Sequence, residues 1–123
     1  MASSPSASRT RGIRVLAAAG AGAGVLLLAR PERVLAAAAP AFPRDRRWIV
    51  RLLGARLLAQ HGLVLLRPER EVLAAGAAVD ALHAASMLPF TASDRYGRAA
   101  RISGAVAACS AAVDARLARS QRR

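Results

Sequence analysis

The sequence contains no lysine, a single cysteine and very few aromatic residues. One Trp, one Tyr and two Phe are spread over 123 residues, which is less aromatic bulk than a soluble core of this size usually holds. Cys109 has no second cysteine with which to form a disulfide, so a disulfide framework is excluded. Two histidines and one cysteine are also too few for a closed zinc site, and we expect no metal and no cofactor.

Motifs of catalysis are missing as well. No Gly-rich phosphate loop follows a strand, and no stretch alternates with the period of two that predicts a strand. The segment DALHAAS contains Asp80, His83 and Ser86, but successive steps of three residues on a helix turn these side chains away from one another. We therefore predict that the chain is not an enzyme.

What the sequence does contain is apolar segments separated by arginine. The apolar fraction is 54%, mostly Ala, Leu and Val, and all nineteen basic residues are arginine, giving a net charge of +12. A charge of this size suggests nucleic-acid binding. The arginines, however, gather at the ends of the apolar segments, where lipid headgroups would lie. This distribution argues against a nucleic-acid partner.

The tetrapeptide RPER occurs twice, beginning at Arg30 and at Arg67. In both copies an aliphatic run precedes it and an Ala-rich run follows. Pro31 and Pro68 are suited to the first turn of a helix, where a missing N–H costs nothing. The glutamate after each proline then occupies the second helical position, where the helix dipole favours an anion. Each copy predicts a tight polar corner between two helices, with its arginines in a headgroup layer.

The remaining organisation follows from helical periodicity and its breaks. Residues 1–11 are Ser-rich and predict a disordered tail, and residues 117–123 form a basic C-terminal tail. Between them, residues 12–116 form one all-α domain. Its helices are predicted over residues 12–29, 31–39, 48–66, 71–90 and 97–116, and the second of these is a short interfacial helix.

The first helix has a second interpretation. An Arg-containing head, an apolar stretch and the residues LAAAA together resemble a secretory signal. The first RPER corner interrupts this stretch before any small-residue cleavage site. We favour a retained helix, with a cleaved signal as the alternative.

The choice between membrane and water depends on how much polar surface each helix can offer. The longest uncharged run, residues 15–29, is shorter than the roughly 18 apolar residues of a standard span. A surface helix in water, however, needs a polar face, and residues 72–90 offer only Asp80, His83 and Ser86. We therefore predict a small four-helix transmembrane bundle with a short interfacial helix after the first span.

Small residues at a spacing of four support close packing in lipid. Gly20 and Gly24 form a G-x-x-x-G motif, and Gly104, Ala108 and Ala112 repeat the pattern in the last helix. We expect both sets to lie at helix–helix contacts.

Four of the polar residues inside the predicted spans are candidates for a buried site. Arg56 and Asp80 each lie roughly 16–18 Å from the second corner, at about 1.5 Å per residue, which places them at equal depth on adjacent antiparallel helices. Gln60 lies one turn from Arg56, and His83 lies three residues after Asp80. Since an intramembrane charge nearly always pairs or faces a cavity, we predict a buried Arg56–Asp80 pair. It is interpreted either as a structural ion pair or as part of a proton or substrate site built on Asp80 and His83.

Three segments resemble an uncharacterised family of small bacterial, actinobacterial-type four-helix integral membrane proteins of unknown function. They are GVLLLARPERVLAAAAPAFPRD, RWIVRLLGARLLAQHGLVLL and AVDALHAAS, within residues 24–86. Gly54, Arg56 and Asp80 match the family's G-x-R and Asp positions. The resemblance implies a four-helix membrane fold and a membrane location, and it implies no reaction.

The expected function is a structural or accessory role in the cytoplasmic membrane, as a multi-pass protein. The lipid bilayer is the expected partner, together with a second copy of the chain or another membrane protein. One alternative is a small transporter or proton-coupled carrier that uses Asp80 and His83. Another is a soluble or membrane-surface helical protein rich in Ala and Arg.

Overall fold

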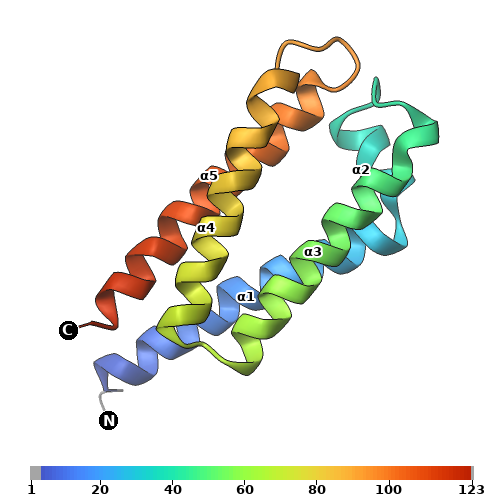
Figure 1. The fold of residues 1–123 in the computed structure, drawn as a ribbon. Coiled ribbons are helices and arrows are strands. Elements are labelled where there is room, and N and C mark those ends of the chain that lie inside the picture. Colours follow the sequence, from blue (N-terminus) through green and yellow to red (C-terminus); the bar gives the residue numbers. More distant parts are fainter. Residues whose placement is uncertain (1–3, 123) are drawn as a thin grey trace.

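The protein is helical throughout the part that the computed structural model describes, residues 4–122 (Figure 1). The helices are α1 (Pro5–Ala29), α2 (Pro31–Ala38), α3 (Arg47–Leu66), α4 (Arg70–Met87) and α5 (Gly97–Ser120). Short 3-10 turns, η1 (Arg44–Arg46) and η2 (Leu88–Phe90), begin α3 and end α4. The prediction of an all-α fold is confirmed, since no strand occurs within these residues.

Three helical segments of the described chain are long and apolar enough to cross a membrane. They are Pro5–Ala29, Arg44–Leu66 and Arg70–Phe90. α5 has 24 residues, one fewer than α1, and is less apolar. By length and composition, therefore, three of the four predicted spans qualify.

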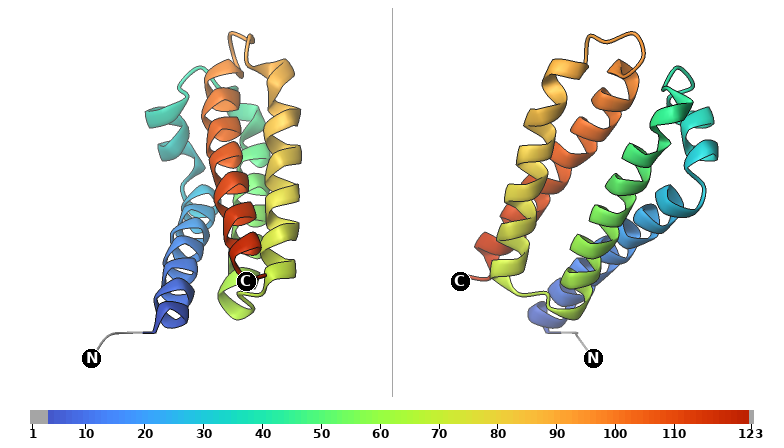
Figure 2. Two further views of the ribbon diagram at one scale, coloured as in Figure 1. Left: turned by 90° about the vertical axis from the view of Figure 1, so that its left-hand side faces the viewer. Right: turned by 45° about the vertical axis from the view of Figure 1, so that its right-hand side comes forward.

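The long helices form two antiparallel pairs. α1 packs along α3, and α4 packs along α5, as the two views in Figure 2 show. The chain passes from the first pair to the second through the short α3–α4 connection. We refer to these pairs as the α1/α3 hairpin and the α4/α5 hairpin.

Two apolar clusters lie at opposite ends of the hairpins. The first joins all four long helices near the two chain termini, through Ile13, Ala17, Val64, Leu73 and Ala118. The second joins the α2–α3 connection to the start of α5, through Ala39, Phe42 and Val50 with Tyr96 against them. There the Phe42 and Tyr96 rings meet edge to face, with centroids 5.3 Å apart.

Bulky aliphatic side chains lie mainly on the outside. Leu52 is 63% exposed, Leu82 is 72% exposed and Val106 is 58% exposed, whereas the buried positions are largely Ala and Gly. A protein folded in water normally places such side chains inside. We call this outward placement of bulky aliphatic side chains the inverted polarity of the fold.

Glycines bring α1 and α3 into backbone contact. A methyl group on Gly24 would lie 2.7 Å from the Gly54 carbonyl oxygen, and one on Gly54 would lie 2.8 Å from the Gly24 carbonyl oxygen. The His61 imidazole lies directly over Gly20, where any larger residue would clash with it. The predicted Gly20–Gly24 motif thus lies at a helix–helix contact, while Gly22 faces open space.

Of the small residues predicted at contacts of the last helix, Gly104 does lie against α4: a methyl group there would be 3.3 Å from the Met87 Cβ atom. Ala108 and Ala112 are exposed, whereas Ala100, Ala107 and Ala118 are buried. The buried set is spaced by seven and eleven residues, as expected for a helix that keeps one seam against its neighbour. Residues spaced by four rotate progressively away from that seam, so the prediction for Ala108 and Ala112 was wrong.

Both predicted tails are shorter than expected. α1 begins at Pro5 because the Ser4 hydroxyl accepts the Ala7 N–H at 3.4 Å and proline occupies the first helical position. The disorder predicted for residues 5–11 was therefore wrong; residues 1–3 lie outside the described part. α5 continues to Ser120 because Leu117 and Ala118 pack against the first apolar cluster, and residue 123 also lies outside the described part.

The two RPER corners differ. Pro31 opens α2 and Glu32 lies in its first turn, as predicted. At the second corner Glu69 is the N-cap and α4 begins only at Arg70, so the predicted helical position of Glu69 was wrong. The physical reason is tertiary: the Pro68 carbonyl accepts a hydrogen bond from the Gln121 side chain at 3.1 Å, which holds this residue in the connection before the helix.

The glycine contact predicts opposite outcomes for two matched substitutions. Gly24→Ala should lower the free energy of unfolding in detergent by about 1–3 kcal/mol, because the added methyl forces two backbones apart. Gly22→Ala adds the same methyl on the same helix into open space, and should leave that free energy unchanged or slightly higher. Denaturant titration followed by circular dichroism measures both. Equal effects at the two positions would contradict the packing described.

Candidate functional site

Three polar side chains from α3 and α4 meet between the hairpins. An Nη1–Oδ1 distance of 3.2 Å joins Arg56 to Asp80. The Gln60 amide donates to the other Asp80 carboxylate oxygen at 3.0 Å, and Arg56 donates to the Gln60 carbonyl oxygen at 3.4 Å. Asp80 is 1% exposed and Arg56 is 26% exposed. We call these three residues the Asp80 network.

The local sequence explains how the network forms. Arg56 and Gln60 are four residues apart on α3, so they project from the same face, one turn apart. Asp80 comes from α4, which runs antiparallel to α3 from the second corner. Gly76 lies one turn before Asp80, and a methyl group there would lie 3.3 Å from the Gln60 amide nitrogen. The absence of a side chain at Gly76 therefore makes room for the Gln60 amide.

The network satisfies Asp80 more completely than Arg56. Each carboxylate oxygen of Asp80 accepts a hydrogen bond. The Nε of Arg56 is buried and has no hydrogen-bond partner among the described residues. A buried carboxylate without partners is costly, and its pairing offsets that cost. The arrangement is therefore suited to a structural role, in which Arg56 and Gln60 hold the Asp80 side chain in place.

His83 does not join this network. Its Nε2 lies 2.6 Å from the Ser103 hydroxyl oxygen, so its hydrogen bond ties α4 to α5 within one hairpin. The predicted residues thus divide: Arg56 and Gln60 meet Asp80 between the hairpins, and His83 is directed to a different neighbour.

A second group of polar residues lies in a cavity between the hairpins. The cavity has a volume of about 180 Å³ and is lined by all four long helices. Its polar lining residues are His61 of α3 with Ser110 and Asp114 of α5. Asp114 was not among the site residues predicted from the sequence. The available signal was its spacing of seven from Ala107, which places it on the buried seam of α5.

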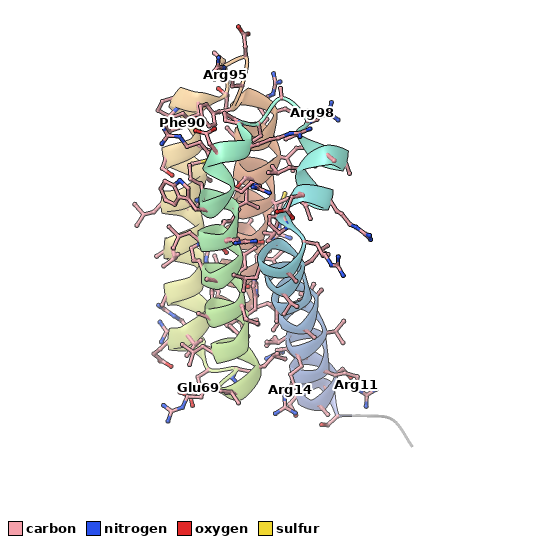
Figure 3. All side chains as sticks on the ribbon, turned by 90° about the vertical axis from the view of Figure 1, so that its right-hand side faces the viewer. Arg11, Arg14, Glu69, Phe90, Arg95 and Arg98 are labelled. Carbon is pink, nitrogen blue, oxygen red and sulfur yellow. The ribbon has the colours of Figure 1, made fainter. Side chains whose placement is uncertain are left out.

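The corner residues lie at the ends of helices α1 and α3. Arg30 ends α1 beside Pro31, and Arg67 ends α3 before Pro68. In Figure 3, Arg11, Arg14 and Glu69 lie at one end, and Phe90, Arg95 and Arg98 lie at the other. The helical segments between these two ends carry few charged side chains.

An exposed ion pair fastens α2 to α3 at the first corner. Arg47 Nη1 and Glu32 Oε1 are 2.7 Å apart. Hydrogen bonding from backbone N–H at the start of α2, together with the Arg47 guanidinium, lowers the pKa of Glu32 below its ordinary value. Since Glu32 is solvent-exposed, this pair adds little to the free energy of unfolding.

No protein-family model, curated protein or solved structure matches this chain. The resemblance to a bacterial membrane family stays a prediction from the sequence. Among residues 4–122, no group of three or more His, Cys, Asp or Glu side chains is placed to hold a metal ion. The Asp80 network and the cavity are therefore interpreted from their own geometry.

The Asp80 network predicts a non-additive pair of substitutions. Arg56→Leu or Asp80→Asn alone should lower the free energy of unfolding by about 3–5 kcal/mol, because each leaves a buried polar group without its partner. The double variant Arg56→Leu with Asp80→Leu should recover most of this loss, because neither charge is then buried. Denaturant titrations in detergent measure all three variants.

The exposed pair supplies the control for that cycle. Glu32→Leu and Arg47→Leu, alone and together, should each cost little and add without coupling. Additive losses at Arg56 and Asp80 would show that the two residues do not act as a pair.

Proposed function

We propose that the chain is a multi-pass integral membrane protein with a structural or accessory role, in which the Asp80 network joins two helical hairpins inside the bilayer. The location we propose is the cytoplasmic membrane of a bacterium. One observation carries the proposal: the outward position of the bulky aliphatic side chains.

In water this surface would be unfavourable. Leu52, Leu82 and Val106 lie on three different long helices and are each more than half exposed. They belong to seventeen large hydrophobic residues that are exposed in the structure, more apolar surface than a protein in water usually shows. In a bilayer the same side chains contact lipid, and small residues let the helices approach one another. The inverted polarity therefore favours a membrane over the soluble and membrane-surface alternatives.

Helix length supports the same conclusion. α1 has 25 residues, or about 37 Å at 1.5 Å per residue, which exceeds a hydrocarbon core of about 30 Å. α3 and α4, with their adjoining 3-10 turns, also meet the length and composition of a span. Figure 3 shows Arg11 and Arg14 at one end of the bundle and Arg95 and Arg98 at the other, as a headgroup layer requires.

We include α5 as the fourth membrane helix. Its inner seam of small residues packs against α4, and Ile102, Val106 and Val113 are exposed on its outer surface. Its charged residues lie near its two ends, apart from Asp114, which lines the cavity. Such a helix is stabilised in a bilayer by its neighbours rather than by its own hydropathy.

The geometry favours a structural role for Asp80 over a carrier role. Both carboxylate oxygens are already occupied, and the side chain is 1% exposed, so a proton or substrate has no open route to it. His83, the second residue of the alternative carrier site, is bonded to Ser103 instead. The network therefore acts as a joint between the hairpins.

Membrane integration predicts that the expressed protein stays in the membrane pellet after an alkaline carbonate wash. Two leucine variants sharpen the test. Leu82→Asp places a charge on the outer surface near the middle of α4 and should strongly reduce the amount retained, by the cost of a central membrane charge, about 2.5–3.5 kcal/mol. Leu66→Asp alters a leucine that is even more exposed, at the end of α3 within the headgroup layer, and should be tolerated.

Two results would contradict the proposal. One is recovery of the wild-type chain as a detergent-free soluble monomer. The other is equal membrane retention of the two leucine variants.

A further inference from the structure

The cavity between the hairpins has a composition that the structural joint does not require. It is lined by Gly20 of α1, His61 of α3, and Ser110 and Asp114 of α5, with aliphatic side chains over most of the remaining wall. Ser110 lies four residues before Asp114, so the hydroxyl and the carboxylate share one face of α5. A joint built on Arg56 and Asp80 needs none of these groups.

Two carboxylates lie between the hairpins, but only one of them has an arginine partner. Arg56 is within ion-pair distance of Asp80, while Asp114 has no ion-pair partner among the described residues. Asp114 nonetheless lies next to the network, because its Oδ2 and the Gln60 amide nitrogen are each 3.3 Å from the point that a methyl on Gly76 would occupy. The Gln60 amide thus lies near two carboxylates, of which only Asp80 is paired with a guanidinium. An intramembrane carboxylate in this position needs a cation or a proton.

The chemistry of the wall selects the kind of cation. Ser110 and Asp114 supply only a few oxygen atoms, whereas Mg²⁺ and Ca²⁺ require six or more oxygen ligands. An ammonium group, in contrast, needs only the carboxylate and the hydroxyl as acceptors. The aliphatic wall from Leu57, Leu73 and Val113 then accommodates an apolar body.

The volume limits the size of the ligand. A cavity of about 150 Å³ is enough to hold benzene, and this cavity measures about 180 Å³. A single aromatic ring or a short branched alkyl chain with one ammonium group is therefore the largest ligand that fits without movement of the helices.

We propose that the cavity binds a small organic cation, with an ammonium group on Asp114 and Ser110 and an apolar body among the aliphatic side chains. The inference rests on the proposed membrane function, because the bilayer is what removes water from around Asp114. It assigns to the chain a binding site separate from the Asp80 network.

The test compares two ligands of nearly the same shape that differ in charge. Benzylamine is a cation near pH 7, and benzyl alcohol is neutral. The full chain in detergent micelles should bind benzylamine at least about tenfold more tightly by calorimetry, since only the cation pairs with the carboxylate. Asp114→Asn should remove this preference. Asp94→Asn, an exposed carboxylate of the α4–α5 loop, is the matched control and should retain it.

A second measurement needs no variant. Nuclear Overhauser contacts between benzylamine and the Leu73 methyl groups place the ligand in the cavity, because Leu73 lines it and is only 1% exposed, out of reach of detergent. Equal affinity for the two ligands, an unchanged preference in Asp114→Asn, or the absence of Leu73 contacts in the wild type would each overturn the inference.

The carbonate wash separates this inference from the proposed function. A protein that stays in the membrane pellet but fails the benzylamine test defeats only the cation site. A protein that is lost from the pellet defeats the membrane proposal, whatever it binds.

Discussion

Asp80 is a carboxylate that lies between two hairpins and is almost completely removed from solvent, and the rest of the structure depends on how its charge is compensated. Arg56 and Gln60 reach it from α3, so one ion pair and one further hydrogen bond set the depth of α3 relative to α4. Within each hairpin, small residues bring the helices together without any charge. In a medium with no water to solvate the Asp80 carboxylate, separating the hairpins would remove its ion-pair partner and leave the charge unpaired, which is costly. The pair therefore determines how the two halves meet, and the glycines determine how each half packs.

The level of a residue along its helix could be predicted from the sequence, whereas the direction of its side chain around the helix axis could not. The rise per residue placed Arg56 and Asp80 at one level, and the structure brings their side chains to 3.2 Å. His83 lies within one turn of the same level, yet it points to Ser103, because rotation is set by which face meets the neighbouring helix. Asp114 was missed for the same reason: the seam of α5 follows Ala100 and Ala107, and a spacing of four residues does not reveal it. The second corner differed from the first because Gln121 holds Pro68, a contact between distant parts of the chain.

The inverted polarity of the bundle connects the fold to both proposals. Many leucines and valines are exposed on the outside, while glycine and alanine make up most of the buried positions and Asp80 is buried among them. Small inner residues bring the backbones close, and they also leave space where the hairpins do not meet closely. That space is the cavity that holds His61, Ser110 and Asp114. One carboxylate is thus compensated by the protein's own guanidinium, and the other faces a cavity sized for a small ligand.

The environment of the outward-facing leucines tests this account most directly. After Cys109, which is exposed, is replaced by alanine, a nitroxide label at Leu82 in reconstituted vesicles reports whether this surface contacts lipid or water. A second label at Arg95, at one end of the bundle, is the reference for water. The account predicts that the Leu82 label collides mainly with dissolved oxygen, which concentrates in hydrocarbon, and that the Arg95 label collides mainly with a water-soluble nickel chelate. If the Leu82 label collided with the nickel chelate as often as the Arg95 label does, that result would contradict the account.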